Sequence, residues 1–243
     1  MAGLSPLAAG ESQSAGYGAT YTRCGSEGRR DVTAAISRLD LGSYEAPRAA
    51  ALAGVPLSTV YDWARKDIVV PSISPSREKL WSYGDLLTLR LVRWLRSDKP
   101  DARRTAMAEV RAMLDRFADD LWREAASGHA RPTIAVDASG HVFHVKRSES
   151  VSGQRAFDDA LDLFAPFQDG PDLREPDAHL RIVPGRCAGE PHLLGTRLTT
   201  RTIAALFERG YDLDTIAALY PDEDSDALGE ALRFEQRLVH AAN

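Results

Sequence analysis

The chain has 243 residues, of which 44% are hydrophobic and 27% charged, a composition that supports packed cores in two or three small domains. No apolar run approaches the roughly 20 residues that a membrane helix needs, and the segment from Met1 to Thr20 lacks the basic start of a secretory signal. Cys24 and Cys187 lie far apart without metal-ligand spacing, which fits a reducing compartment. We therefore expect a cytoplasmic protein with no membrane partner.

The net charge of −5 conceals a basic segment. Residues 45–104 carry a net charge of +4, whereas residues 105–180 carry −6, residues 181–243 carry −3 and residues 1–44 are neutral. Because attraction to phosphate depends on the local field, the total charge does not exclude a nucleic-acid partner.

The first predicted elements follow a polar tail. Residues 1–28 are rich in Gly, Ser and Ala and are predicted to be disordered, and a short helix is predicted over 32–39. Residues 44–66 have the pattern of a helix, a turn and a second helix. The two prolines within residues 68–80 predict an extended segment there.

Two longer helices are predicted next. The first covers 82–96, with Ser82 as its N-cap, Asp85 three residues later and apolar side chains at helical spacing. Lys99-Pro100 ends it, and the second helix is predicted from Asp101 to about Glu124.

The middle of the chain changes its period. Residues 133–136 and 141–145 alternate around a turn that contains glycine, which predicts a β-hairpin. A helix is predicted over 154–167, followed by a linker over 168–177. Residues 180–183 are predicted to form one more strand, which could lie beside the hairpin.

The helix–turn–helix pattern in the N-terminal half meets specific physical demands. A small residue is required where the helices cross, a glycine four positions later, and apolar residues six and nine positions after that glycine. Ala50, Gly54, Val60 and Trp63 occupy these positions. A two-helix corner in an ordinary helical bundle would show the same spacing, so the pattern favours DNA binding without requiring it.

The residues around this pattern resemble the DNA-binding half of the MerR superfamily. The resemblance covers about residues 43–96 and rests on Trp63-Ala-Arg-Lys-Asp-Ile68, Pro71, Trp81-Ser-Tyr83 and Asp85-Leu86. It implies a short wing after the second helix. The chain lacks the long dimerisation helix and effector region of that family, so metal sensing and promoter untwisting are not expected.

The predicted DNA contacts lie on the second helix and on the wing. The outward face of the second helix would offer hydroxyls and cations to phosphates, and Arg65 could bind a phosphate or a guanine edge. The resemblance places two further cations on the wing. The candidates are Ser58, Thr59, Tyr61, Asp62, Arg65, Lys66, Arg77 and Lys79.

The C-terminal segment is dense in turn residues. Three glycines punctuate residues 185–195, Gly210 is predicted to end one helix, and Asp212 is predicted to cap the next. Pro221 ends that helix, and a last helix is predicted with Leu228, Ala231 and Leu232 on its inner face.

This segment is similar to a small domain of unknown function found in many VapB-like antitoxins. The similarity rests on Gly189-Glu-Pro191, Leu193-Leu-Gly-Thr-Arg197, Tyr220-Pro221 and Ala231. The sequence as a whole predicts a mainly α fold with small β elements. Its predicted parts are a disordered tail (1–28), a MerR-like winged helix-turn-helix domain with an extra helix (29–127), a connecting region with the hairpin (128–180) and a C-terminal trihelical, helix-turn-helix-like domain (181–243).

Together the two resemblances imply the antitoxin of a VapBC-like toxin–antitoxin module. Such a protein would bind a PIN-domain ribonuclease toxin and repress its operator, and helix-turn-helix proteins usually act as homodimers. Arg197 and Arg201 are candidates for toxin binding, although a structural role for Arg197, as a helix cap or a partner of a carboxylate, is the competing interpretation. The alternative function is a stand-alone MerR-like regulator without a toxin, and a third is a pure interaction adaptor.

The sequence predicts no enzyme, no catalytic residues, no metal site and no cofactor. His141 and His144 face opposite sides of a predicted strand, so they cannot bind one metal together. The carboxylates of Asp158, Asp159 and Asp162 are of the type that binds Mg²⁺, but the favoured interpretation is a solvated acidic face of a helix.

Overall fold

The computed structural model describes residues 40–100, 102–126, 134–136, 140, 142–144 and 162–242. Within these ranges the chain is mainly helical with small two-stranded antiparallel sheets, which confirms the predicted fold class. The predictions of a disordered tail over 1–28 and of a helix over 32–39 lie outside the described residues.

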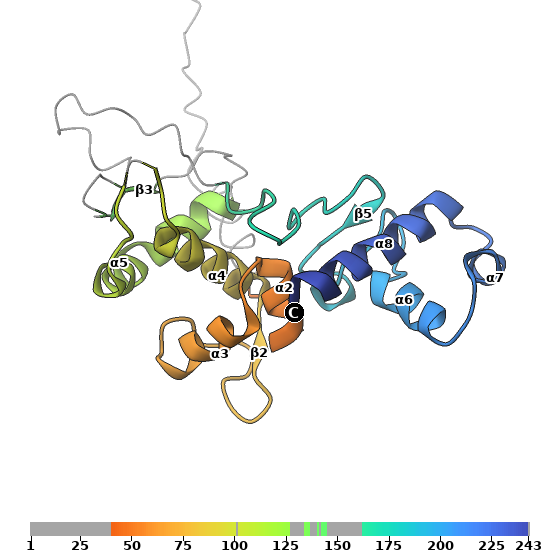
Figure 1. Ribbon diagram of the computed structural model, residues 1–243, viewed down its shortest axis with the longest axis horizontal. Helices are drawn as coiled ribbons and strands as arrows, with labels where there is room; N and C mark the ends of the chain where they lie inside the picture. The colour runs from red at the N-terminus through yellow and green to blue at the C-terminus, as the bar shows by residue number, and fades with distance from the viewer. Residues whose placement is uncertain are drawn as a thin grey trace, which may run out of the picture.

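The elements are, in chain order, β1 (Tyr44–Glu45), α2 (Ala46–Ala53), α3 (Leu57–Arg65), β2 (Leu80–Trp81), α4 (Tyr83–Arg96), α5 (Met107–Ala126), β3 (Ile134–Val136), β4 (Val142–His144), β5 (Leu180–Arg181), the short 3-10 helix η2 (Cys187–Gly189), β6 (His192–Leu193), α6 (Thr200–Glu208), α7 (Leu213–Leu219) and α8 (Ser225–Ala242) (Figure 1).

The predicted helix over 82–96 is confirmed as α4. Ser82 and Asp85 form a reciprocal capping box, in which the Ser82 hydroxyl accepts from the Asp85 N–H and the Asp85 carboxylate accepts from the Ser82 N–H. The leucines of α4 are buried, α4 packs on α2, and β1 pairs with β2 with Tyr44 opposite Trp81. These elements form the N-terminal core.

The helix predicted from Asp101 begins only at Met107, as α5. The intervening residues instead bind the end of α4. The Thr105 N–H donates to the Leu95 carbonyl, and the Arg96 guanidinium donates to the Thr105 carbonyl at 2.8 Å. This stretch satisfies polar groups at the end of α4 that would otherwise lack partners, because a helix leaves its last carbonyls unbonded.

The predicted hairpin is confirmed. β3 and β4 pair in antiparallel register, with Val136 opposite Val142. Gly140 in the connecting turn has a φ of +88°, which favours glycine, and an added Cβ would come within 2.8 Å of the Arg103 carbonyl.

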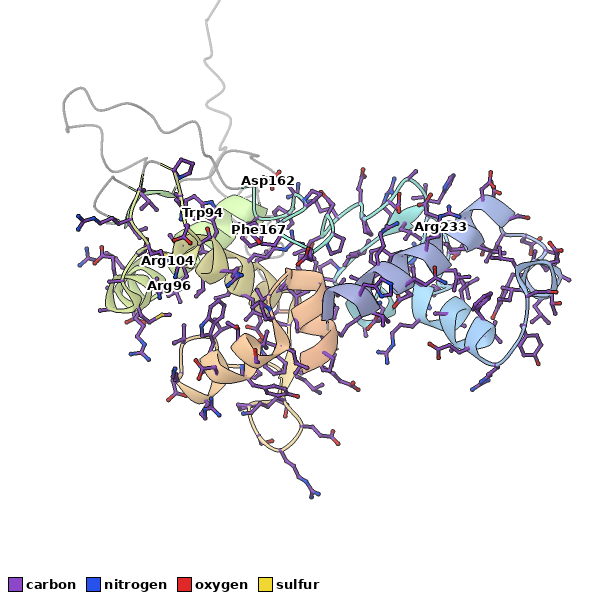
Figure 2. The ribbon with its side chains drawn as sticks, in the orientation of Figure 1. Trp94, Arg96, Arg104, Asp162, Phe167 and Arg233 are labelled. Atoms are coloured by element: carbon purple, nitrogen blue, oxygen red, sulfur yellow. The ribbon has the colours of Figure 1, made fainter. Side chains whose placement is uncertain are left out.

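Two predictions for residues 154–177 are wrong where the structure describes them. Residues 162–167 form bends rather than a helix, whereas 154–161 lie outside the described residues. Residues 168–177 are not a free linker, because Leu173 is fully buried. Figure 2 shows Phe167 above α2 and α4, on the side of the molecule from which the chain continues toward β5.

The strand predicted over 180–183 is confirmed only as the short β5, and it does not lie beside the hairpin. β5 pairs with β6, Leu180 opposite Leu193, so the C-terminal part closes its own small sheet. Only residues 182–191, which contain Gly185 and Gly189, separate β5 from β6 along the chain, whereas the hairpin ends at His144.

The C-terminal helices follow the prediction closely. Gly210 follows the C-cap of α6 with a φ of +94°, and the Asp212 carboxylate caps α7 by accepting from the Thr215 N–H at 2.8 Å. Leu228 and Ala231 are fully buried on the inner face of α8, as predicted. α8 packs on α6 and α7 and extends to α2 (Figure 1), so it connects both halves of the described structure.

None of the helices in the described part of the chain combines the length and the apolar character needed to cross a membrane.

Candidate nucleic-acid interface

The turn between α2 and α3 is built around Gly54. This residue has a φ of +67° and its N–H bonds the carbonyls at the end of α2, so it ends that helix in the left-handed conformation. The Val55 N–H donates to the Ala50 carbonyl at 3.0 Å, and Pro56 precedes the first residue of α3. All the predicted positions of the helix–turn–helix pattern are therefore occupied as expected.

α3 divides into a buried face and an open face. Val60 is fully buried and Trp63 nearly so, which fixes the helix on α2. Tyr61 is 45% exposed and the Arg65 side chain 75% exposed, and both lie on the opposite side. Ser58 is exposed and Thr59 half-buried. The open face thus carries the side chains predicted to contact DNA.

A carboxylate already occupies part of this face. Asp62 accepts from Arg65 at 2.9 Å and from Lys66 at 2.7 Å, and these two bonds, the one from Lys66 first, lower the pKa of Asp62 below its ordinary value. Approaching phosphates would compete with Asp62 for both cations.

The predicted wing is a loop between α3 and β2, held at its base. The Asp85 carboxylate accepts from the Ser72 N–H at 2.9 Å and from the Ser72 hydroxyl at 2.8 Å, which attaches the loop to the start of α4. Burial raises the pKa of Asp85, against the effect of the hydrogen bonds that it accepts. The loop and α3 project on the same side of the molecule (Figure 1).

The two predicted cations of the wing differ in their surroundings. Arg77 is exposed at the end of the loop. Lys79 is half-buried, and its ammonium donates to the Pro75 carbonyl at 3.1 Å, within the loop itself. Arg77 is therefore the freer of the two to meet a phosphate.

Arg111 is a cation of this surface that no sequence pattern indicated. Its guanidinium reaches from α5 to the Lys66 carbonyl at the end of α3, at 2.7 Å. The contact joins residues far apart in the sequence, so only the tertiary structure reveals it.

The back of the helix–turn–helix unit is held by a buried arginine. Arg90 of α4 is fully buried, and burial lowers its pKa to about 10. Its guanidinium donates to the backbone carbonyls of Leu52, Leu163, Phe164, Ala165 and Pro171. It thereby fastens residues 162–171 to α2, opposite the open face of α3.

A second buried cation joins the N-terminal unit to the C-terminal part. Arg48 of α2 donates to Glu190 at 2.7 Å and to Glu235 of α8 at 2.7 and 2.8 Å. Burial opposes the charge of Arg48, but its bonds to the two carboxylates outweigh burial and raise its pKa. Thr200 also donates to Glu235. We call Arg48, Glu190, Glu235 and Thr200 the junction cluster.

The two arginines predicted to bind a toxin lie elsewhere. Arg201 is 56% exposed and forms an ion pair with Glu190 at 3.5 Å, at the edge of the junction cluster. Arg197 is exposed, and within the described residues its guanidinium neither caps a helix nor meets a carboxylate. The structure does not bring these two arginines together with the open face of α3.

No group of three or more His, Cys, Asp or Glu side chains in the described ranges is arranged to hold a metal ion. The structure does not describe the side chains of His144 and Asp158, two of the residues considered as metal ligands from the sequence.

The comparisons with known proteins found one family match, confined to the C-terminal part, and one similar solved structure. Residues 181–234 match the family model described as a protein of unknown function (DUF433). Among solved structures, the X-ray crystal structure of Rv2018 from Mycobacterium tuberculosis is similar, with 19% identity over 80% of this chain and 99% of that chain and a TM-score of 0.43. The curated proteins contain no match. The match to this domain agrees with the C-terminal resemblance read from the sequence.

Proposed function

We propose that the protein is the antitoxin of a type II, VapBC-like toxin–antitoxin system. It binds operator DNA through the open face of α3 and the adjacent wing, and it neutralises a PIN-domain ribonuclease through its C-terminal half. The observation that carries the DNA-binding part is α3 itself, whose one side is buried by Val60 and Trp63 while the other leaves Tyr61 and Arg65 exposed beside a cationic loop.

The toxin-binding part of the proposal is supported by the domain of unknown function at residues 181–234. The residues of this segment resemble a domain found in many VapB-like antitoxins. A PIN-type nuclease binds RNA and therefore presents cations, to which an acidic partner is complementary. In this proposal the protein acts as a cytoplasmic homodimeric repressor that needs neither a cofactor nor a catalytic residue of its own.

The DNA-binding part is tested by gel shift with the DNA upstream of the gene. We expect tight binding that weakens steeply between about 50 and about 200 mM salt. Arg65→Ala should weaken it about tenfold and lower the salt slope by about one, because one cation–phosphate contact is lost. Arg233→Ala removes an exposed arginine from α8, far from α3, and should change neither quantity. Absence of a shift at low salt contradicts the proposal.

The toxin-binding part is tested by co-expression with the neighbouring reading frame. A small PIN-like nuclease encoded there should co-purify with the protein and lose its ribonuclease activity in the complex. Operator binding without such a partner would instead identify a stand-alone MerR-like regulator.

A further inference from the structure

The outer end of the C-terminal part exposes large apolar side chains. Phe207 is 42% exposed, Tyr211 43% and Leu219 53%. They are three of the ten exposed large hydrophobic residues in the described ranges, and all three lie within the segment formed by α6, its following turn and α7. We call this segment, continued into the first turn of α8 at residue 226, the α6–α7 end.

These side chains are not the core of the three-helix unit. Ile203 and Ile216 fill that core and are fully buried, with Leu206 and Leu213 packed partly against it. Phe207 lies one helical turn after Ile203, and Leu219 lies three residues after Ile216, so these exposed side chains flank the buried face, while Tyr211 lies in the turn between the two helices. Because three large exposed apolar side chains occur within residues 207–219, the α6–α7 end is a candidate interaction site.

The charge around these residues indicates the chemistry of that occupant. Residues 207–226 contain seven carboxylates and a single cation, Arg209. Other carboxylates of the C-terminal part are used internally, since Glu190 and Glu235 bind Arg48 and Glu230 binds His179. Within the described part of the chain, no ion pair neutralises the carboxylates of residues 207–226.

Some of these carboxylates also have local structural roles. Asp212 caps α7, and Asp224 accepts from the Asp226 N–H at the start of α8. These bonds hold the carboxylates in place at the surface without cancelling their charge. A partner at the α6–α7 end would thus meet negative groups on the same segment as the exposed apolar side chains.

We propose that the α6–α7 end is the docking surface for the toxin and receives its basic, RNA-binding face. This inference rests on the proposed function and names the site of its protein partner. Protein interfaces combine apolar core residues with a polar rim, and charge complementary to that of the partner gives orientation and a fast encounter. Occupation of the nuclease's cationic face by carboxylates would exclude RNA from it.

The location agrees with this role. α7 lies at the far end of α8 from α2 and α3 (Figure 1), and Figure 2 shows side chains projecting outward there. The face of α8 that meets α2 is already occupied by the junction cluster, which leaves the α6–α7 end free for a partner.

The test uses the full chain and the purified nuclease from the neighbouring frame, with binding measured by calorimetry at about 50 and about 200 mM salt. Phe207→Ser combined with Tyr211→Ser should weaken binding about tenfold or more, because anchors at the centre of an interface carry most of its affinity. Asp214→Lys combined with Asp222→Lys should slow association and flatten the salt dependence.

Two matched controls address nonspecific effects. Leu194→Ser removes an apolar side chain that is 55% exposed outside the α6–α7 end, and Asp169→Lys reverses an exposed charge near the N-terminal unit. Both should bind the nuclease as the wild type does. The α6–α7 variants should keep the operator affinity of the wild type, because that end of the molecule lies far from α3, and all variants should still unfold cooperatively.

The outcomes separate the two proposals. If the wild type does not bind the nuclease, the proposed function fails and this inference with it. If the wild type binds and the α6–α7 variants bind equally well, only the docking surface is wrong. If Phe207→Ser dissociates a dimer of the free chain, as measured by sedimentation, the surface joins two copies of this protein and the inference is overturned.

Discussion

Gly54 carries two constraints at a single position. Its φ of +67° favours glycine, and an added Cβ would overlap with the Phe167 carbonyl and approach Gly170, both of them backbone groups that cannot rotate away. The turn of the helix–turn–helix unit and the segment behind it are therefore in direct backbone contact.

We expect Gly54→Ala to destabilise the protein more than a comparable change elsewhere. Gly210→Ala is the matched control, because Gly210 has a φ of +94° but open space around its Cα. The control should lose about 1 kcal/mol of unfolding free energy through backbone strain alone. Gly54→Ala should lose about 2 kcal/mol more, because the added methyl overpacks the contact with Phe167. Denaturant unfolding measures both, and equal losses would show that the contact yields easily.

Asp62 is a second single residue whose substitution tests one interaction. Its carboxylate holds Arg65 and Lys66 on the open face of α3. We expect Asp62→Asn to raise operator affinity up to about fivefold, because an exposed ion pair is weak and both cations become available to phosphates. A gel shift over a salt series measures the change. A loss of affinity confined to the operator, with nonspecific binding unchanged, would instead mean that Asp62 accepts from a cytosine edge.

The sequence predicted residues with local roles better than residues with distant ones. Gly54, Ser82, Gly210 and Asp212 act on backbone a few positions away, and their spacing indicates those roles before any fold is known. Arg90 and Arg111 bind carbonyls far along the chain, and nothing in their immediate neighbours marks them.

At the scale of the elements, α2 and α8 are joined by a nearly buried ionic contact. The side chains of the junction cluster are about one-tenth exposed, with Arg48 at 10%, Glu190 at 13% and Glu235 at 11%. Removing the cation would leave two nearly buried carboxylates without a countercharge, and such an uncompensated charge is costly.

We therefore expect Arg48→Ala to lower the free energy of unfolding by about 3 kcal/mol. Arg104→Ala breaks an exposed ion pair with Asp98 and should change stability little. Urea unfolding, followed by far-UV circular dichroism, compares the two. If the two variants unfold alike, the junction cluster does not hold α2 and α8 together.

The elements that the sequence missed lie where periodicity gives no signal. Residues 102–105 read as the start of a helix, but their polar groups bind the end of α4. Residues 168–177 read as a linker because they contain glycine and prolines, yet Leu173 is fully buried and the Tyr83 hydroxyl donates to its carbonyl at 2.6 Å. One buried leucine among turn residues is too little pattern to predict packing.

At the scale of the whole molecule, the basic and acidic segments identified in the sequence lie in different places. The basic residues 45–104 include α3 and the wing, whereas the acidic residues 207–226 lie at the far end of α8 (Figure 1). Composition alone gave the contrast between segments. It did not show that the two charged surfaces lie far apart, because that depends on how α8 packs on α2.

This separation predicts that DNA and the nuclease bind at the same time. The open face of α3 and the α6–α7 end share no residue, so a partner on one leaves the other accessible. Adding the nuclease to the protein–operator complex should therefore produce a slower band in a gel shift. The Phe207→Ser, Tyr211→Ser variant should retain the first band and lose the second, whereas Arg65→Ala should weaken both together. Release of DNA by the nuclease would instead mean that the two sites overlap or oppose each other through the junction cluster, and Arg48→Ala should then reduce that release.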